Sequence, residues 1–314
     1  MVPDLCTDIS NRNSKEQTVN HKIIVFVKQV PDTKNVTGQA MKPDGTINRA
    51  ALPAIFNPED LNALELALEL KDRYQATVTV AAMGLPAAAA ILRDSLCRGA
   101  DEAVLLTDRA LGGSDTLATS FALSRLAKTI GGYDLILCGR QAIDGDTAQV
   151  GPQIAEKLAL PQISYVQEVQ DYTEKTIRAK RAIEGGYEIL EAPLPVLMTV
   201  VDANEPRPQN AHRILKFRKA KTPSEVVAAC GGDAAAAAPE IEKLRSRGLL
   251  IRELGAKDAV PEDEFGRLGL AGSPTKVKQI MSVVLTAGEF KKIEPTADGV
   301  SALVHELIED HTLG

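Results

Sequence analysis

The sequence predicts an α/β fold, in which a parallel β-sheet is covered by helices on both faces. Short apolar runs alternate with helix-like segments from residue 22 onward. The connections between them are short, which favours parallel pairing with right-handed crossovers. The first run, residues 23–27, is apolar without alternation and is therefore typical of a strand buried on both faces.

Helix signals are clearest after Asn57. This residue is a candidate cap, Pro58 suits the first helical position, and leucines then recur at helical spacing. A second helix starts at Pro86 and stops at Gly99. The predicted strands of this part cover residues 23–27, 77–81, 103–106 and 135–138, and the predicted helices cover 58–72, 86–97 and 116–130.

The pattern is less regular in the connections. A Pro-Asp-Gly turn signal within residues 42–48 favours an exposed hairpin or arm over residues 34–50. In the helix after the strand at 135–138, Asp146 or Thr147 is a candidate cap, and Pro152 should then kink the helix.

Residues 163–169 and 176–183 alternate in polarity and predict a small antiparallel extension, with a turn at Gly185-Gly186 after it. Residues 196–201 form another buried run. Apolar residues become sparse beyond residue 211, although helical segments are expected near 239–253 and 298–310. The predicted organisation is a poorly structured leader (1–21), an α/β domain (22–211) and an extended C-terminal arm (212–314).

Composition excludes several classes of protein. The net charge of −6 argues against a nucleic-acid partner, which would need a basic face. No apolar stretch is long enough to predict a membrane span, and residues 1–21 have no signal-peptide pattern. We therefore expect a cytoplasmic protein. The four cysteines are far apart without CxxC spacing, so we expect no metal site.

The most informative segment is DLILCGRQAIDGDTAQVGP, residues 134–152. A buried strand ends at Gly139, and a loop of small and polar residues then opens a helix. Such a loop presents free backbone N–H groups and a positive helix end to an anion, usually a phosphate. Because ligands bind at the carboxyl ends of parallel strands, we expect four loops to meet there. They are residues 28–33, 83–86, 111–116 and 139–147.

Several blocks together resemble the β subunit of electron transfer flavoprotein, over roughly residues 22–218. They are VKQVPDT (27–33), NPED (57–60), LRDSLCRGAD (92–101), GRQAIDGDTAQVGP (139–152) and AKRAIEGGYEILEAPLPVLMT (179–199). The last block is the most specific. The resemblance implies a flavodoxin-like domain, similar also to the adenine-nucleotide alpha-hydrolases, whose C-terminal arm wraps a partner α subunit.

The family has two branches. Ordinary members hold AMP in the β subunit. Electron-bifurcating members hold FAD there, which takes a hydride from NADH. One electron then passes to ferredoxin or flavodoxin, and the other passes through the FAD of the α subunit to a flavin dehydrogenase of the acyl-CoA, enoyl-CoA or lactate type. The small residues within 144–152 make this chain more similar to the bifurcating branch. Ser114, where the family usually has alanine, is a departure.

The resemblance also implies the site residues, and it implies no general acid, general base or metal ligand. The adenine and ribose would contact Phe26, Asn57, Asp60 and Met83. The diphosphate would contact Gly139, Arg140, Gln141, Ala142, Ile143, Asp144, Gly145, Asp146, Thr147, Ala148, Gln149 and Val150. Asp115, Thr116 and Thr119 would lie nearer the isoalloxazine ring.

Alternatives remain open at this stage. Asn57 and Asp60 can cap a helix, Phe26 and Met83 can be core residues, and Asp144 and Asp146 can be turn formers. Arg140 can pair with a phosphate or with a partner carboxylate. For the whole chain, the alternatives are a non-bifurcating β subunit that binds AMP and an ATP-binding protein of the same architecture.

Overall fold

The computed structural model describes residues 21–32, 52–201, 204–275 and 292–309. The predicted hairpin at 34–50 lies outside these ranges, as does all of the predicted leader except His21. Both therefore remain predictions.

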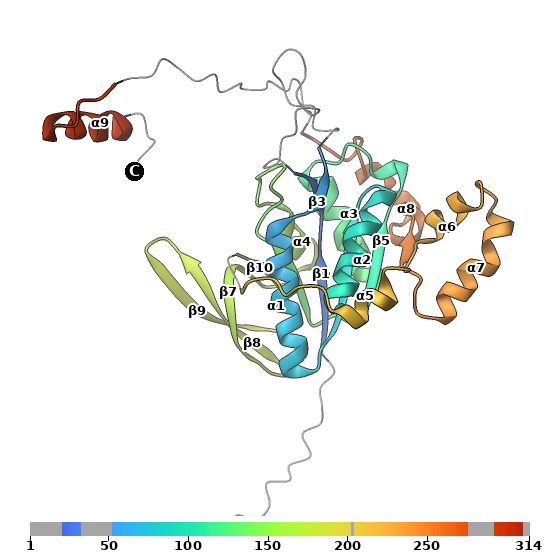
Figure 1. Ribbon diagram of the computed structural model, residues 1–314. Helices are drawn as coiled ribbons and strands as arrows, with labels where there is room; N and C mark the ends of the chain where they lie inside the picture. Colours follow the sequence, from blue (N-terminus) through green and yellow to red (C-terminus); the bar gives the residue numbers. More distant parts are fainter. Residues whose placement is uncertain (1–20, 33–51, 202–203, 276–291, 310–314) are drawn as a thin grey trace, which may run out of the picture.

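A single large sheet organises the described residues (Figure 1). Its strand order is β11-β5-β4-β1-β6-β10-β7-β8-β9, with parallel pairing from β11 to β7 and antiparallel pairing from β7 to β9. The predicted α/β class is confirmed. The strands are β1 (Lys22–Phe26), β4 (Thr77–Met83), β5 (Glu102–Leu106), β6 (Leu135–Gly139), β7 (Gln162–Tyr172), β8 (Thr176–Ile183), β9 (Gly186–Pro193), β10 (Val196–Val200) and β11 (Arg252–Leu254). A separate antiparallel pair consists of β2 (Gln29–Pro31) and β3 (Ala54–Phe56).

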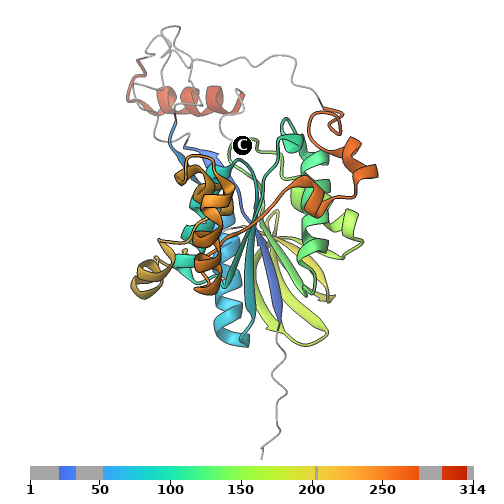
Figure 2. The ribbon, with the colours of Figure 1, turned by 90° about the vertical axis from the view of Figure 1, so that its right-hand side faces the viewer.

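Helices cover both faces of the parallel strands (Figure 2). α1 (Pro58–Tyr74) and α2 (Ala89–Arg98) pack on one face, and α3 (Thr116–Ile130) and α4 (Val150–Leu158) pack on the other. Strand β1 explains the unalternating apolar run, because Ile23 and Val25 belong to the first core and Ile24 and Phe26 to the second. Both faces of the strand are therefore buried.

Two local features differ from the sequence-based predictions. Residues 186–193 form strand β9, which pairs with β8 over its whole length, whereas only a turn was expected at Gly185-Gly186. Helix α4 begins at Val150 with Gln149 at its N-cap, so Asp146 and Thr147 do not cap it. Pro152 consequently lies in the first turn, where no intrahelical N–H bond is required, and the expected kink has no cause.

The C-terminal half of the chain contributes to the cores. Phe217, Val226, Leu244 and Ile251 are buried in the first core, and β11 extends the sheet beside β5. Part of the segment beyond residue 211 therefore packs on the α/β domain, and the division into a domain (22–211) and an arm (212–314) stays a prediction. The elements are α5 (Ala211–Phe217), α6 (Pro223–Ala229), α7 (Ala234–Ser246), α8 (Ala256–Ala259), the 3-10 helix η5 (Glu262–Arg267) and α9 (Ala297–Glu309). Helix α9 has no buried residue. Its contact with a partner subunit remains a prediction.

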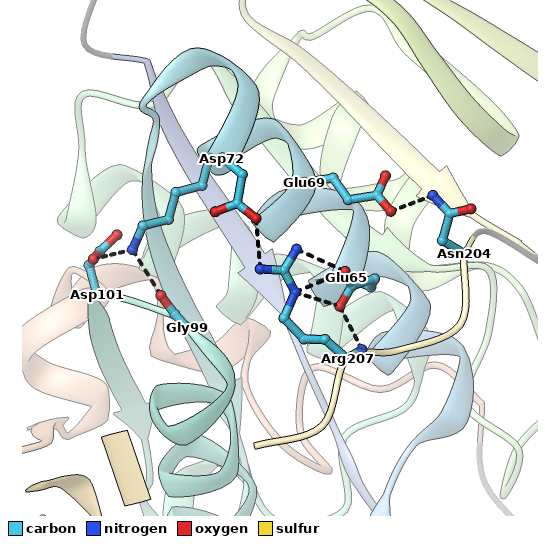
Figure 3. A network of polar contacts seen from close by, with 8 residues as sticks. Glu65, Glu69, Asp72, Gly99, Asp101, Asn204 and Arg207 are labelled. Carbon is cyan, nitrogen blue, oxygen red and sulfur yellow. Dashed lines mark hydrogen bonds and ion pairs between the residues drawn. The ribbon is translucent and has the colours of Figure 1, made fainter. Parts of the chain in front are cut away.

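After β10 the chain is held against α1 by charged side chains (Figure 3). The Arg207 guanidinium hydrogen-bonds the carboxylate of Glu65, with an Nε–Oε1 distance of 2.9 Å, and that of Asp72, with an Nη1–Oδ2 distance of 2.8 Å. The Asn204 amide also donates to Glu69. Since the Glu65 side chain is only 7% exposed, Arg207 supplies the countercharge that this buried carboxylate needs.

Candidate functional site

A cavity of about 430 Å³ lies at the carboxyl ends of β1, β4 and β6. The N-terminal ends of α3 and α4 form its other side. All of the residues that the sequence pointed to line this cavity except Asn57, Ile143, Asp144 and Asp146. Lys28, Leu111, Gly113 and Ser114, from two of the loops expected to meet here, also line it. The lining residues without any such expectation are Val27, Leu123, Cys138 and Gly151.

The loop after β6 is held by the first residues of α1. Asn57 is fully buried and occupies the N-cap position, but its side chain makes no cap bond. Its Nδ2 donates to the carbonyl oxygen of Gln141 (2.9 Å), and its Oδ1 accepts from the N–H of Ile143 (3.2 Å). Asn57 therefore sets the conformation of the loop instead of capping its own helix.

Asp60 joins the ends of two strands at the base of the cavity. Its Oδ2 accepts from the N–H of Lys28 (2.8 Å), and its Oδ1 accepts from the N–H of Gly139 (3.1 Å). Burial raises the pKa of Asp60 to about 7, against the opposing effect of its hydrogen bonds. The approach is close enough to require glycine at 139, because a Cβ there would lie 2.5 Å from Asp60 Oδ1 and 2.6 Å from the Glu59 carbonyl carbon.

Charged pairs fix the rest of the loop. Glu59 accepts from Arg140 Nη2 (2.7 Å) and from the N–H of Gln141 (3.1 Å). In the structure Arg140 therefore pairs with a carboxylate of its own chain, that of Glu59. Lys28 Nζ binds both oxygens of Asp144, at 2.7 and 2.8 Å.

Asp146 accepts from the side-chain amide of Gln141 at 3.0 Å. Like Asp144, it does not line the cavity. Neither acidic residue of the loop therefore presents an unpaired carboxylate to a ligand.

The N-terminal end of α4 is the strongest candidate anion site. Asp146 and Ala148 adopt left-handed backbone conformations, with φ of 48° and 53°. Within the described part of the chain, the N–H groups of Thr147, Ala148 and Gln149 have no hydrogen-bond acceptor, and α4 has no side-chain cap. Unpaired N–H groups at a positive helix end attract an anion.

The neighbouring helix α3, by contrast, is capped by its own chain. Asp115 Oδ1 accepts from the N–H groups of Leu117 (2.9 Å) and Ala118 (3.0 Å). Desolvation raises the pKa of Asp115, but hydrogen bonds from Ala118, Thr275 and Leu117 outweigh it and hold the pKa below the ordinary value. Asp115 is therefore a structural cap on the wall of the cavity.

The two helices are joined across the cavity wall. Thr116 Oγ1 donates to Gln149 Oε1 (2.8 Å), and one turn later Ser120 Oγ donates to Gln153 Oε1 (2.8 Å). The apolar part of the lining includes Phe26, Met83, Leu111, Leu123 and Cys138.

Burial and the neighbouring Asp60 raise the pKa of the Cys138 thiol, which is therefore neutral and not a nucleophile. The cavity thus combines a polar N–H-rich end with an apolar body, which suits a nucleotide. Within the described residues there is no cluster of side chains suited to hold a metal ion, and no helix is long and apolar enough to cross a membrane.

Comparison with known proteins identifies the family. The model of the electron transfer flavoprotein domain matches residues 44–243. The chain belongs to the electron transfer flavoprotein family. It is 42% identical over 293 residues to the electron transfer flavoprotein subunit beta of Clostridium acetobutylicum, covering 92% of this chain and 98% of that protein. The resemblance to the electron transfer flavoprotein β subunit is thereby confirmed.

Two further relatives carry names of larger complexes. The acryloyl-CoA reductase electron transfer subunit gamma of Anaerotignum propionicum is 38% identical, over 92% of this chain and 96% of that protein. The caffeyl-CoA reductase-Etf complex subunit CarD of Acetobacterium woodii is 50% identical over 188 residues, which cover 59% of this chain and 71% of that protein. The first name is that of an electron transfer subunit of a reductase, and the second is that of a subunit of a reductase-Etf complex.

Proposed function

We propose that this chain is the β subunit of a heterodimeric electron transfer flavoprotein and that it binds FAD in the cavity between β6 and α3. The observation that carries the proposal is the uncapped end of α4, where the N–H groups of Thr147, Ala148 and Gln149 find no acceptor among the described residues. These groups would donate to the diphosphate oxygens, as at other helix N-terminal ends that bind phosphate.

The remaining lining residues fit such a ligand. A Cβ built on Gly145 would meet no atom within 4 Å, so the loop leaves room for close approach of a diphosphate. Lys28 lines the cavity, and its ammonium group neutralises the carboxylate of Asp144, which would otherwise repel a diphosphate. The raised pKa of Asp60 keeps part of this carboxyl neutral at pH 7, which lessens its repulsion of an anion.

The role of the protein is to bind and orient the cofactor and to shield it from water. When bound, FAD would supply the chemistry of accepting a hydride and passing on single electrons. Phe26, Met83, Leu111 and Leu123 provide an apolar environment that excludes water. Helices α3 and α4, joined through Thr116 and Gln149, hold the two walls at a constant spacing.

The proposed electron donor is NADH, and the proposed acceptors are ferredoxin or flavodoxin and, through the α-subunit FAD, a flavin dehydrogenase in the cytoplasm. The names of the relatives in acryloyl-CoA and caffeyl-CoA reductase complexes support such a dehydrogenase partner. If AMP occupies the cavity instead, the chain has a structural role and NADH has no site of reaction on it.

A cavity-filling variant tests this proposal. Thr119 lines the cavity, whereas Lys128 on the same helix is exposed and does not. In the complex with the α subunit, Thr119→Trp should abolish reduction of ferredoxin by NADH, and Lys128→Trp should leave it unchanged. Unchanged ferredoxin reduction in Thr119→Trp, or none in the unaltered complex, would contradict the proposal.

A further inference from the structure

One wall of the cavity contacts a segment that follows η5 in the C-terminal part of the chain. We call residues 268–275 the C-terminal strap. Leu268 anchors it in the second core, and the N–H of Leu270 donates to the carbonyl oxygen of Gly112 (3.0 Å). A Cβ on Gly269, whose φ is +55°, would lie 2.2 Å from the Ala110 carbonyl oxygen, so the two backbones are in direct contact.

Ser273 is the polar centre of this contact. It is 3% exposed, and its Oγ accepts from the N–H of Asp115 at 2.8 Å. The same hydroxyl donates to the Gly269 carbonyl oxygen (2.7 Å), with the Gly113 carbonyl oxygen at 3.3 Å. The hydrogen bonds of this one side chain therefore join the strap to the loop in front of α3.

Asp115 is held by the strap from a second side. Its Oδ2 accepts from the N–H of Thr275 (3.0 Å), while its Oδ1 caps α3. Thr116 follows directly in the chain, and the N–H of Thr119 donates to the Asp115 carbonyl oxygen (2.9 Å). A displacement of Asp115 would therefore move the part of α3 that lines the cavity.

We propose that Ser273 is a positioning residue for the nucleotide cavity, acting through Asp115 on the wall that carries Thr116 and Thr119. The inference rests on the proposed function, in that the cavity holds an adenine nucleotide. Without the hydroxyl, the N–H of Asp115 has no acceptor and the loop before α3 is attached only through its other bonds to the strap. The wall then opens more often, and the nucleotide leaves faster.

The test measures nucleotide release from the complex with the α subunit. Ser273→Ala is compared with Ser95→Ala, which removes a similarly buried hydroxyl. Among the described residues, this hydroxyl bonds only to the Ile91 carbonyl oxygen in its own helix. Loss of one hydrogen bond of ordinary strength predicts about tenfold faster release from Ser273→Ala. Ser95→Ala should release nucleotide at the unaltered rate, although its thermal midpoint also falls.

A second variant covers the case in which Ser273→Ala does not fold. Thr275→Pro removes both the N–H and the hydroxyl that hydrogen-bond the Asp115 carboxylate, at an exposed position, and should also speed release. Release from both variants at the rate of Ser95→Ala would overturn the inference. Chromatography of the released nucleotide tests the proposed function separately, because it distinguishes FAD from AMP whatever the rates are.

Discussion

Replacing Gly139 by alanine tests how the end of β6 fits against α1. The φ of Gly139 lies outside the left-handed region, so alanine meets no backbone conformational barrier. The new Cβ would instead lie 2.5 Å from Asp60 Oδ1, 2.6 Å from the Glu59 carbonyl carbon and 2.7 Å from the Asp60 nitrogen. Two of these atoms belong to the backbone, so no rotation of a side chain relieves the overlap.

The expected cost follows from overpacking. Added atoms in a tightly packed site destabilise by about 1–3 kcal/mol, and the smaller entropy of the unfolded alanine variant offsets roughly 0.5 kcal/mol of that. We therefore expect Gly139→Ala to lower the free energy of unfolding by about 2 kcal/mol in urea titrations, without a change of slope. Since the overlap separates Asp60 from the Gly139 N–H, retention of nucleotide should fall as well.

Gly145 provides the matched control, because it lies in the same loop and its added Cβ would meet no atom within 4 Å. Gly145→Ala should change the free energy of unfolding by less than about 0.5 kcal/mol. Equal unfolding midpoints for the two variants would refute the argument that direct contact of β6 with α1 requires glycine at position 139.

Three further predictions concern the residues that hold the loop and the chain after β10. Asn57→Ala leaves buried partners in the loop without hydrogen bonds and should cost about 2 kcal/mol in the same urea titration. Burial raises the pKa of Asp60 in the folded state to about 7, so between its ordinary pKa and 7 the folded chain holds a proton that the unfolded chain does not. The free energy of unfolding therefore falls as pH rises through this range. About 3 kcal/mol should be lost between pH 5 and pH 8, and a loss of the same size in Asp60→Asn would contradict this. Arg207→Ala should cost about 2–3 kcal/mol by leaving Glu65 unpaired, and adding Glu65→Leu should recover most of it; no recovery would exclude that cause.

Much of the sheet could be predicted because its parallel strands are buried on both faces and end in recognisable loops. Strand β9 was missed because most of its side chains are exposed, and it is defined by pairing with β8. The start of α4 was misplaced because Asp146 is a good cap by residue type but adopts a left-handed conformation here. The tertiary structure instead places Gln149 at the N-cap, and local residue preference does not reveal this.

The site was predictable where its residues are consecutive in the chain. Residues 139–150 form one loop, and most of them line the cavity. Lys28 belongs to a loop that was expected at this edge of the sheet, whereas Leu123 and Cys138 were missed because helix packing and strand register bring them to the cavity. Ser273 lies 158 residues from Asp115, so no pattern of spacing could connect the two.

The most direct test of the central claim is the nucleotide content of this chain, co-expressed anaerobically with its α subunit, released by denaturation and separated by chromatography. The proposal predicts two FAD per heterodimer and no AMP. One FAD with one AMP would contradict it and would make the chain a non-bifurcating β subunit, in which the N–H groups of residues 147–149 hold the phosphate of AMP.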